Sequence, residues 1–183
     1  MTNAFDLPLQ FTAVSIGLLA LRLVIGLSMA AHGSQKLFGW FGGHGLAGTG
    51  GFFEMIGFRP GRLFALAAGI TEVASGLLIA LGFLGPIGPA LMLSVMIVAA
   101  ITVHLKNGYF AQSNGIELTV MFAVGAVALA FTGFGQFSLD AVTGLAGYFT
   151  TPETLIALAL GVVGAVGNLA MRRGHDTVVS PQS

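Results

Sequence analysis

Two residues of opposite charge lie inside apolar segments of the chain. Arg22 lies in the apolar run 13–31, and Glu72 lies in the next run, 63–83. Each is about ten residues from the loop that joins the two runs, so in helices each would lie about 15 Å from the same membrane surface. An unpaired charge at this depth costs on the order of 2.5–3.5 kcal/mol. The sequence therefore predicts a buried ion pair between Arg22 and Glu72, which either fixes helix packing or belongs to a proton, ion or quinone site.

A second group of polar residues is expected together at one end of the apolar segments: His32, Lys36, His104 and Glu117. Imidazole and carboxylate groups relay protons, bind metals or hydrogen-bond a quinone carbonyl. Each residue also has a structural interpretation, since Glu117 follows Asn114 with the spacing of a capping box and His104 suits a membrane interface. The spacing matches no recognised haem or metal motif, so no metal ligand is assigned. A quinone is favoured over haem or a metal as the cofactor.

The composition shows which elements must position these residues. The chain is 55% hydrophobic and 8% charged, with a mean hydropathy of +0.92, as expected of an integral membrane protein. The apolar runs are continuous rather than alternating, and open sheet edges are not tolerated in lipid. We expect an all-α bundle of five transmembrane helices, at Ala13–Ala31, Leu63–Phe83, Ile87–Val103, Leu118–Phe134 and Thr154–Met171.

Positive charges predict the orientation of the chain in the membrane. Six loop and tail residues fall on one side of the expected topology and none on the other: Lys36, Arg59, Arg62, Lys106, Arg172 and Arg173. The positive-inside rule then places the N-terminal tail, 1–12, outside the cytoplasm. It places the C-terminal tail, 172–183, which is expected to be disordered, inside the cytoplasm.

Composition also limits the partners. The chain has no cysteine, which excludes thiol–disulfide exchange and iron–sulfur ligation by its own thiolates. It has no basic block, which argues against nucleic acid. Lipid is therefore the expected surrounding. In the last run Ala157, Gly161 and Ala165 form a small-residue series, which predicts a packing surface within the bundle or in a homo-oligomer formed through this fifth helix.

Several motifs occur in a recognisable order along the chain. They are Arg22 with Gly26, His32-Gly33-x-x-Lys36-Leu37, Glu72 with Gly76 and Gly82, Asn114-x-x-Glu117, and the run Gly133–Asp140. Together they resemble the DoxX family over residues 16–141. The resemblance implies a four-helix membrane domain, 13–141, followed by an additional segment, 142–171, that contains the fifth helix. Members are similar to the DoxD subunit associated with thiosulfate:quinone oxidation, and some are linked to membrane oxidoreductase complexes or oxidative-stress defence.

This resemblance leads to a functional hypothesis. The chain would be an inner (plasma) membrane protein, acting as a subunit or accessory of a quinone-linked oxidoreductase or oxidative-stress system with redox partner proteins. A quinone headgroup would lie near His32, His104 and Glu117, in a cavity held by Arg22 and Glu72. The alternatives are a small transporter or channel-like protein and a non-catalytic scaffold. A quinone cavity is largely apolar with a few polar groups, whereas a transport path is polar through much of its depth.

Overall fold

The computed structural model describes residues 6–173, which are built from helices and turns without strands. The main helices are α1 (Asp6–Phe38), α2 (Gly45–Met55), α3 (Gly61–Leu81), α4 (Ile87–Ala99), α5 (Glu117–Thr132), α6 (Leu139–Thr143) and α7 (Thr151–Ala170). A π-helical segment, Ala100–His104, continues α4, and short 3-10 turns lie at Trp40–Gly42, Leu105–Asn107, Ala111–Ser113 and Leu145–Tyr148. The predicted all-α membrane fold is confirmed.

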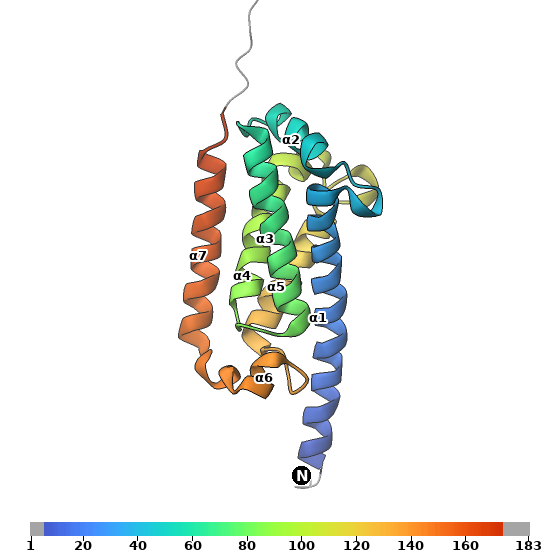
Figure 1. Cartoon of the computed structure of the whole chain (residues 1–183). Helices are drawn as coiled ribbons and strands as arrows, with labels where there is room; N and C mark the ends of the chain where they lie inside the picture. The colour runs from blue at the N-terminus through green and yellow to red at the C-terminus, as the bar shows by residue number, and fades with distance from the viewer. Residues whose placement is uncertain (1–5, 174–183) are drawn as a thin grey trace, which may run out of the picture.

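The described chain has four helical segments that are long and apolar enough to cross a membrane, namely Phe11–Phe38, Gly61–Leu81, Ile87–Asn107 and Thr151–Ala170. Helix α5 is apolar but has only 16 residues, or about 24 Å. Figure 1 shows α1, α3, α4 and α5 as a bundle, with α7 along its edge beside α4. This arrangement agrees with the predicted four-helix bundle and additional C-terminal helix.

Helix α1 is longer at both ends than the predicted run. It has 33 residues and includes residues 6–12, which were expected to form part of an N-terminal tail. It also continues through His32 and Lys36 to Phe38, because no proline interrupts the chain there. Residues 1–5 and 174–183 lie outside the described part, so the tail predictions for them stay predictions.

Small residues bring α1 and α3 into backbone contact. A Cβ atom on Gly26 would lie 2.5 Å from the carbonyl oxygen of Gly76, and one on Gly33 would lie 2.6 Å from that of Gly69. These positions fix the antiparallel register of the two helices. The main apolar core is formed by Met29, Ile79, Met92, Met96, Ala126, Leu129 and Phe134.

Helix α7 packs mainly on α4. It begins with a capping box between Thr150 and Glu153, which satisfies exposed N–H groups. Ala165 is fully buried, and a Cβ on Gly161 would lie 2.5 Å from the carbonyl oxygen of Ala90. The predicted small-residue surface is therefore used within the bundle, and this face is not free for a second copy.

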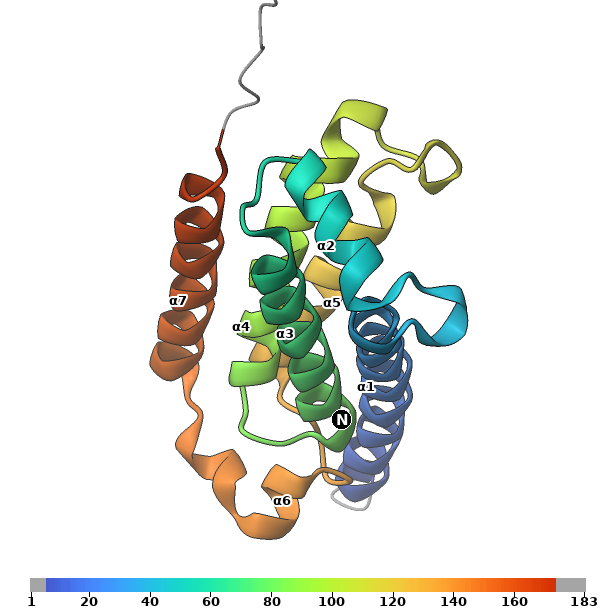
Figure 2. The same ribbon diagram turned by 45° about the horizontal axis from the view of Figure 1, so that its top comes forward.

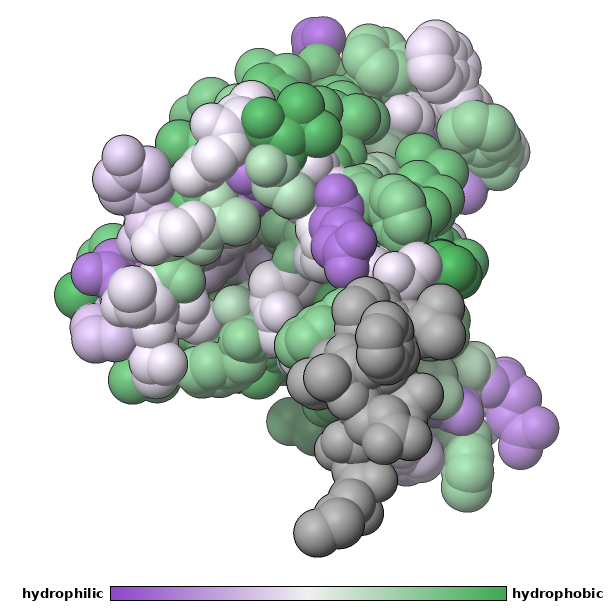
Figure 3. All heavy atoms as spheres, turned by 90° about the horizontal axis from the view of Figure 1, so that it is seen from below, coloured by the Kyte–Doolittle hydropathy of each residue, from purple (hydrophilic) through white to green (hydrophobic). Residues whose placement is uncertain are grey.

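The two ends of the bundle are closed differently. Helix α2 lies across the end where α1 finishes and α3 begins (Figure 2). At that end Arg172 Nε donates to the carbonyl of Ile56 at 2.6 Å, and Arg173 N donates to that of Gly57 at 2.8 Å. The opposite end, with the start of α1 and with α6, exposes mostly hydrophobic and weakly polar residues (Figure 3).

Candidate functional site

Arg22 and Glu72 lie at different levels of the bundle, so the predicted ion pair between them is wrong. The register of α1 against α3, with Gly26 beside Gly76, places Arg22 level with the end of α3. Glu72 lies about eight residues further back along α3, a separation of about 12 Å. The error arose because α1 was expected to end near residue 31. Its continuation to Phe38 shifts the pairing of the two helices.

Arg22 on α1 forms hydrogen bonds to the loop that follows α5. Its side chain is 3% exposed; Nη1 donates to the carbonyl of Phe134 at 3.4 Å and Nη2 donates to that of Phe137. Among the described residues, Nε has no hydrogen-bond partner. Ser15 Oγ supports the same loop by accepting from Gln136 N at 3.2 Å. Arg22 therefore has a structural role at this end of the bundle.

Asp140, at the end of the same loop, forms hydrogen bonds to the turn between α3 and α4. Its carboxylate accepts from Leu84 N at 2.9 Å and Gly85 N at 2.7 Å, and its own N–H donates to the carbonyl of Gly82. A carboxylate that accepts two backbone N–H groups forms strong, charge-assisted bonds. The run Gly133–Asp140 thus holds the α3–α4 turn. In the sequence this run indicated only the family resemblance, and the role of Asp140 as a buried acceptor was not predicted.

Glu72 is paired with Lys36. Glu72 is 3% exposed, and Lys36 Nζ, at the end of α1, lies 2.6 Å from Glu72 Oε1. The pair forms because α1 continues to Phe38 and its lysine reaches down along α3. A buried carboxylate needs such a cation to offset its desolvation. Lys36 and Glu72 were both predicted as site residues, but their pairing with each other was not.

The Lys36–Glu72 pair lies at the wall of a cavity of about 350 Å³. Helices α3, α4 and α7 form its sides, and α2 with Phe58 covers one end. The lining is mainly apolar and includes Phe52, Phe53, Phe58, Phe64, Ala67, Ala68, Leu91, Val95, Val98, Ala99, Val103 and Gly164. The polar lining residues, besides the pair, are Thr49, Thr71, Ser94, Thr102, His104 and Asn168.

His104 is placed at this cavity by the π-helical segment that ends α4. A π turn changes the direction in which later side chains point. His104 lines the cavity, and its Nδ1 lies 2.9 Å from the carbonyl oxygen of Asn114. A carbonyl only accepts, so Nδ1 carries the proton and Nε2 of the neutral ring is an acceptor.

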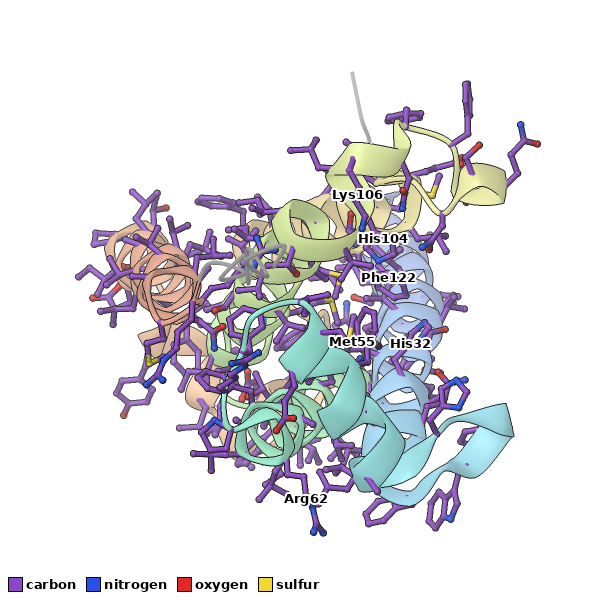
Figure 4. All side chains as sticks on the ribbon, turned by 90° about the horizontal axis from the view of Figure 1, so that it is seen from above. His32, Met55, Arg62, His104, Lys106 and Phe122 are labelled. Carbon is purple, nitrogen blue, oxygen red and sulfur yellow. The ribbon has the colours of Figure 1, made fainter. Side chains whose placement is uncertain are left out.

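His32 and Glu117 do not line this cavity. The His32 ring packs edge-on against Phe122, with centroids 6.0 Å apart, and its Nδ1 lies 3.2 Å from Gln35 Oε1. Glu117 Oε2 accepts from Ala111 N at 2.8 Å and so closes the loop before α5. Figure 4 shows His32, Phe122 and His104 at the α2 end of the bundle and Arg62 at its outer edge. The structure therefore brings Lys36 and His104 to one cavity and gives the other two residues local partners.

Most of the polar cavity residues were not predicted from the sequence. Thr71 and Ser94 lie on helix faces that composition alone does not separate from core. Asn168 could have been predicted as a candidate, because it is the one carboxamide in the last apolar run. Within residues 6–173, no three histidine, aspartate or glutamate side chains are grouped to hold a metal ion.

The fold and its buried polar groups define a multi-pass α-helical membrane protein. The DoxX family model matches residues 17–105, from α1 to just after the π-helical segment, so this part of the chain is similar to the DoxX family. The predicted resemblance is thereby confirmed. The chain is also 26% identical, over 132 residues, to the uncharacterized membrane protein Rv3486 of Mycobacterium tuberculosis, a match that covers 67% of this chain and 78% of the relative. No solved structure gives a significant match.

Proposed function

We propose that this protein binds the headgroup of a membrane quinone in the cavity beside Lys36 and His104. In this role it serves as a subunit or accessory of a quinone-linked oxidoreductase or oxidative-stress system of the inner (plasma) membrane. The observation that carries the proposal is the cavity itself, about 350 Å³ in volume and mainly apolar, with polar side chains that come from several of the surrounding helices. Sites for small molecules have this size and character.

The cavity suits a neutral ring that carries hydrogen-bonding oxygen atoms. Phe53, Phe58 and Phe64 supply aromatic surface for the ring. Lys36 has three N–H groups and two acceptors on Glu72, so one N–H remains for a ligand oxygen. Its charge is already balanced by Glu72, which favours an uncharged ligand over an anionic one.

His104 supports the reduced form of such a ligand. Its Nδ1 proton is directed to Asn114 O, which leaves Nε2 free to accept a hydroxyl proton from a quinol. The other oxygen would accept from Lys36. The chain has no cysteine, so the electrons would be supplied or removed by a partner protein or its cofactor.

The buried apolar cluster favours this proposal over transport. Met29 on α1 and Ile79 on α3 are buried core residues that lie between the Lys36–Glu72 pair and Arg22 along their helices. A translocation path would need polar groups through much of this depth. The two polar regions instead serve separate ends of the bundle.

The test compares two histidines that differ in their access to the cavity. His104→Phe keeps a planar ring but removes both nitrogens, and His32→Phe is its matched control. We expect wild type and His32→Phe to copurify with quinone in mild detergent, and His104→Phe to retain roughly tenfold less, as the loss of one hydrogen bond implies. Mass spectrometry of the bound lipids and quinones measures this. Absence of quinone from wild type, or equal quinone in the two variants, would contradict the proposal.

A further inference from the structure

The cavity has an open side between α3 and α7. Ala67 on α3 and Gly164 on α7 both line it, and both are exposed. Each lies about six residues from the end of its helix nearest α2, or about 10 Å along the axis. Both helices are long and apolar enough to cross a membrane. The opening therefore lies below the helix ends and faces the hydrocarbon of the bilayer, not water.

Helix α7 leaves this side open because it packs mainly on α4 rather than on α3. Figures 1 and 2 both show α7 standing beside α4 at the edge of the bundle. Its C-terminal end is tied toward α3 through Arg172 and Arg173, which donate to Ile56 and Gly57. These contacts close the cavity at the α2 end, and no helix within residues 6–173 covers the flank between α3 and α7.

We propose that the slot between α3 and α7 holds the hydrocarbon tail of the cavity's ligand, so that the ligand is a prenyl- or alkyl-tailed quinone loaded directly from the bilayer. This inference rests on the proposed function and adds the place where the tail binds and the route by which the ligand enters. The slot is lined by Ala67, Ala68, Leu91 and Gly164, which are small or aliphatic, and the hydroxyl of Ser94 lies beside Gly164. A soluble nucleotide cofactor would leave phosphates and sugars in hydrocarbon at this opening, at a large desolvation cost.

Two glycines of α7 give a matched test. A Cβ on Gly164 meets only Ser94 Oγ, at 3.5 Å, and one on Gly167 meets no heavy atom within 4 Å. Both substitutions to leucine replace a helical glycine, so both favour the helix. Gly164 lines the cavity and Gly167 does not. Gly164→Leu therefore fills the slot, while Gly167→Leu controls for the chemical change.

The probe is a benzoquinone with a decyl chain that carries a photoreactive diazirine near its end, added to the full chain in lipid nanodiscs. The competitor is the same benzoquinone without a chain. We expect cross-links on the slot-facing residues of α3 and α7, competed by the chainless ring. Gly164→Leu should lower this competed labelling roughly tenfold or more, because an occupied slot cannot admit the chain, and Gly167→Leu should leave it unchanged. Affinity for the chainless ring should be the same in all three proteins.

The outcomes separate the two proposals. The tail slot is wrong, and the headgroup site stands, if the ring competes but the cross-links lie elsewhere on the surface. The same conclusion follows if the competed labelling is unchanged in Gly164→Leu. An equal loss of affinity for the tailed and chainless quinones in Gly164→Leu also overturns the tail slot. If the ring does not compete at all, the headgroup site fails, and the tail proposal fails with it.

Discussion

Lys36 and Glu72 are the residues whose charges depend most on each other. Glu72 is nearly inaccessible, whereas the Lys36 side chain is 27% exposed at the end of α1. Lysine can reach a buried acid in this way because its aliphatic stem lies along apolar surface. Removing one member of such a pair leaves the other charge unbalanced, whereas removing both leaves an apolar contact. The pair therefore makes a specific prediction for mutational coupling.

Replacing Lys36 with Met should destabilise the protein by about 3–5 kcal/mol, because Glu72 loses its cation. The double variant Lys36→Met/Glu72→Leu should recover most of that loss. Arg22→Leu and Glu72→Leu should instead give additive losses, since these two residues share no contact. Unfolding in detergent, followed by circular dichroism, is measured for the three single variants and for the two double variants, Lys36→Met/Glu72→Leu and Arg22→Leu/Glu72→Leu. Strong coupling of Arg22 with Glu72, and none for Lys36, would restore the pairing expected from sequence.

At the scale of helices, the close contact between α1 and α3 determines which of their polar residues lie side by side. Gly26 and Gly33 on α1 face Gly76 and Gly69 on α3 at backbone distance. Glycine gives up helix propensity at these positions and permits an approach that no other residue allows. This contact places Lys36 beside Glu72 and Arg22 beside the loop that follows α5.

Gly26→Ala should therefore destabilise the bundle strongly. Its new methyl group would lie 2.5 Å from Gly76 O and 2.6 Å from Ala80 N, and backbone atoms cannot move aside as a side chain can. We expect a loss of about 1–3 kcal/mol or more, the cost of overpacking. Gly17→Ala on the same helix is the control, because its methyl group meets no heavy atom within 4 Å.

The control should be neutral or slightly stabilising through its higher helix propensity. Thermal unfolding in one detergent compares the two variants with wild type. Equal midpoints for both alanine variants would show that α1 and α3 are not in this close contact.

These helices also explain what the sequence could and could not predict. The apolar runs predicted the helical fold, and the burial of Arg22 and Glu72 followed from their place within those runs. Lys36 and His104 were predicted as candidates because their chemistry is useful near helix ends. The partner of Glu72 could not be predicted, because it depends on where α1 ends and on the glycine register. The cavity needed α7, whose position on α4 is a tertiary property without a signal in any single segment.

At the scale of the whole molecule, positive charge is concentrated at one end. Lys36, Arg62, Lys106 and Arg172 lie at the end that carries α2 or in its loops, and Arg22 is held inside near the opposite end. The turn between α3 and α4 and the segment from Gly133 to Thr150 contain no lysine or arginine. Lysine and arginine in short loops are retained on the cytoplasmic side during insertion.

This asymmetry predicts that the α2 end faces the cytoplasm. Helix α5 is the critical element, because its 16 residues are fewer than a usual span of about 20. Its beginning joins the loop that contains Lys106, and its end joins the loop held by Arg22 at the other end of the bundle. Helix α5 must then cross the membrane. Because α7 crosses back, the 106–115 loop and the C-terminal end of α7 lie on the same side.

Fusions of green fluorescent protein after Ser183 and within residues 106–115 should fluoresce, while alkaline phosphatase at these positions should be inactive. A phosphatase fusion in the segment 144–150 should be active, and activity after Ser183 instead would mean that α5 does not cross the membrane.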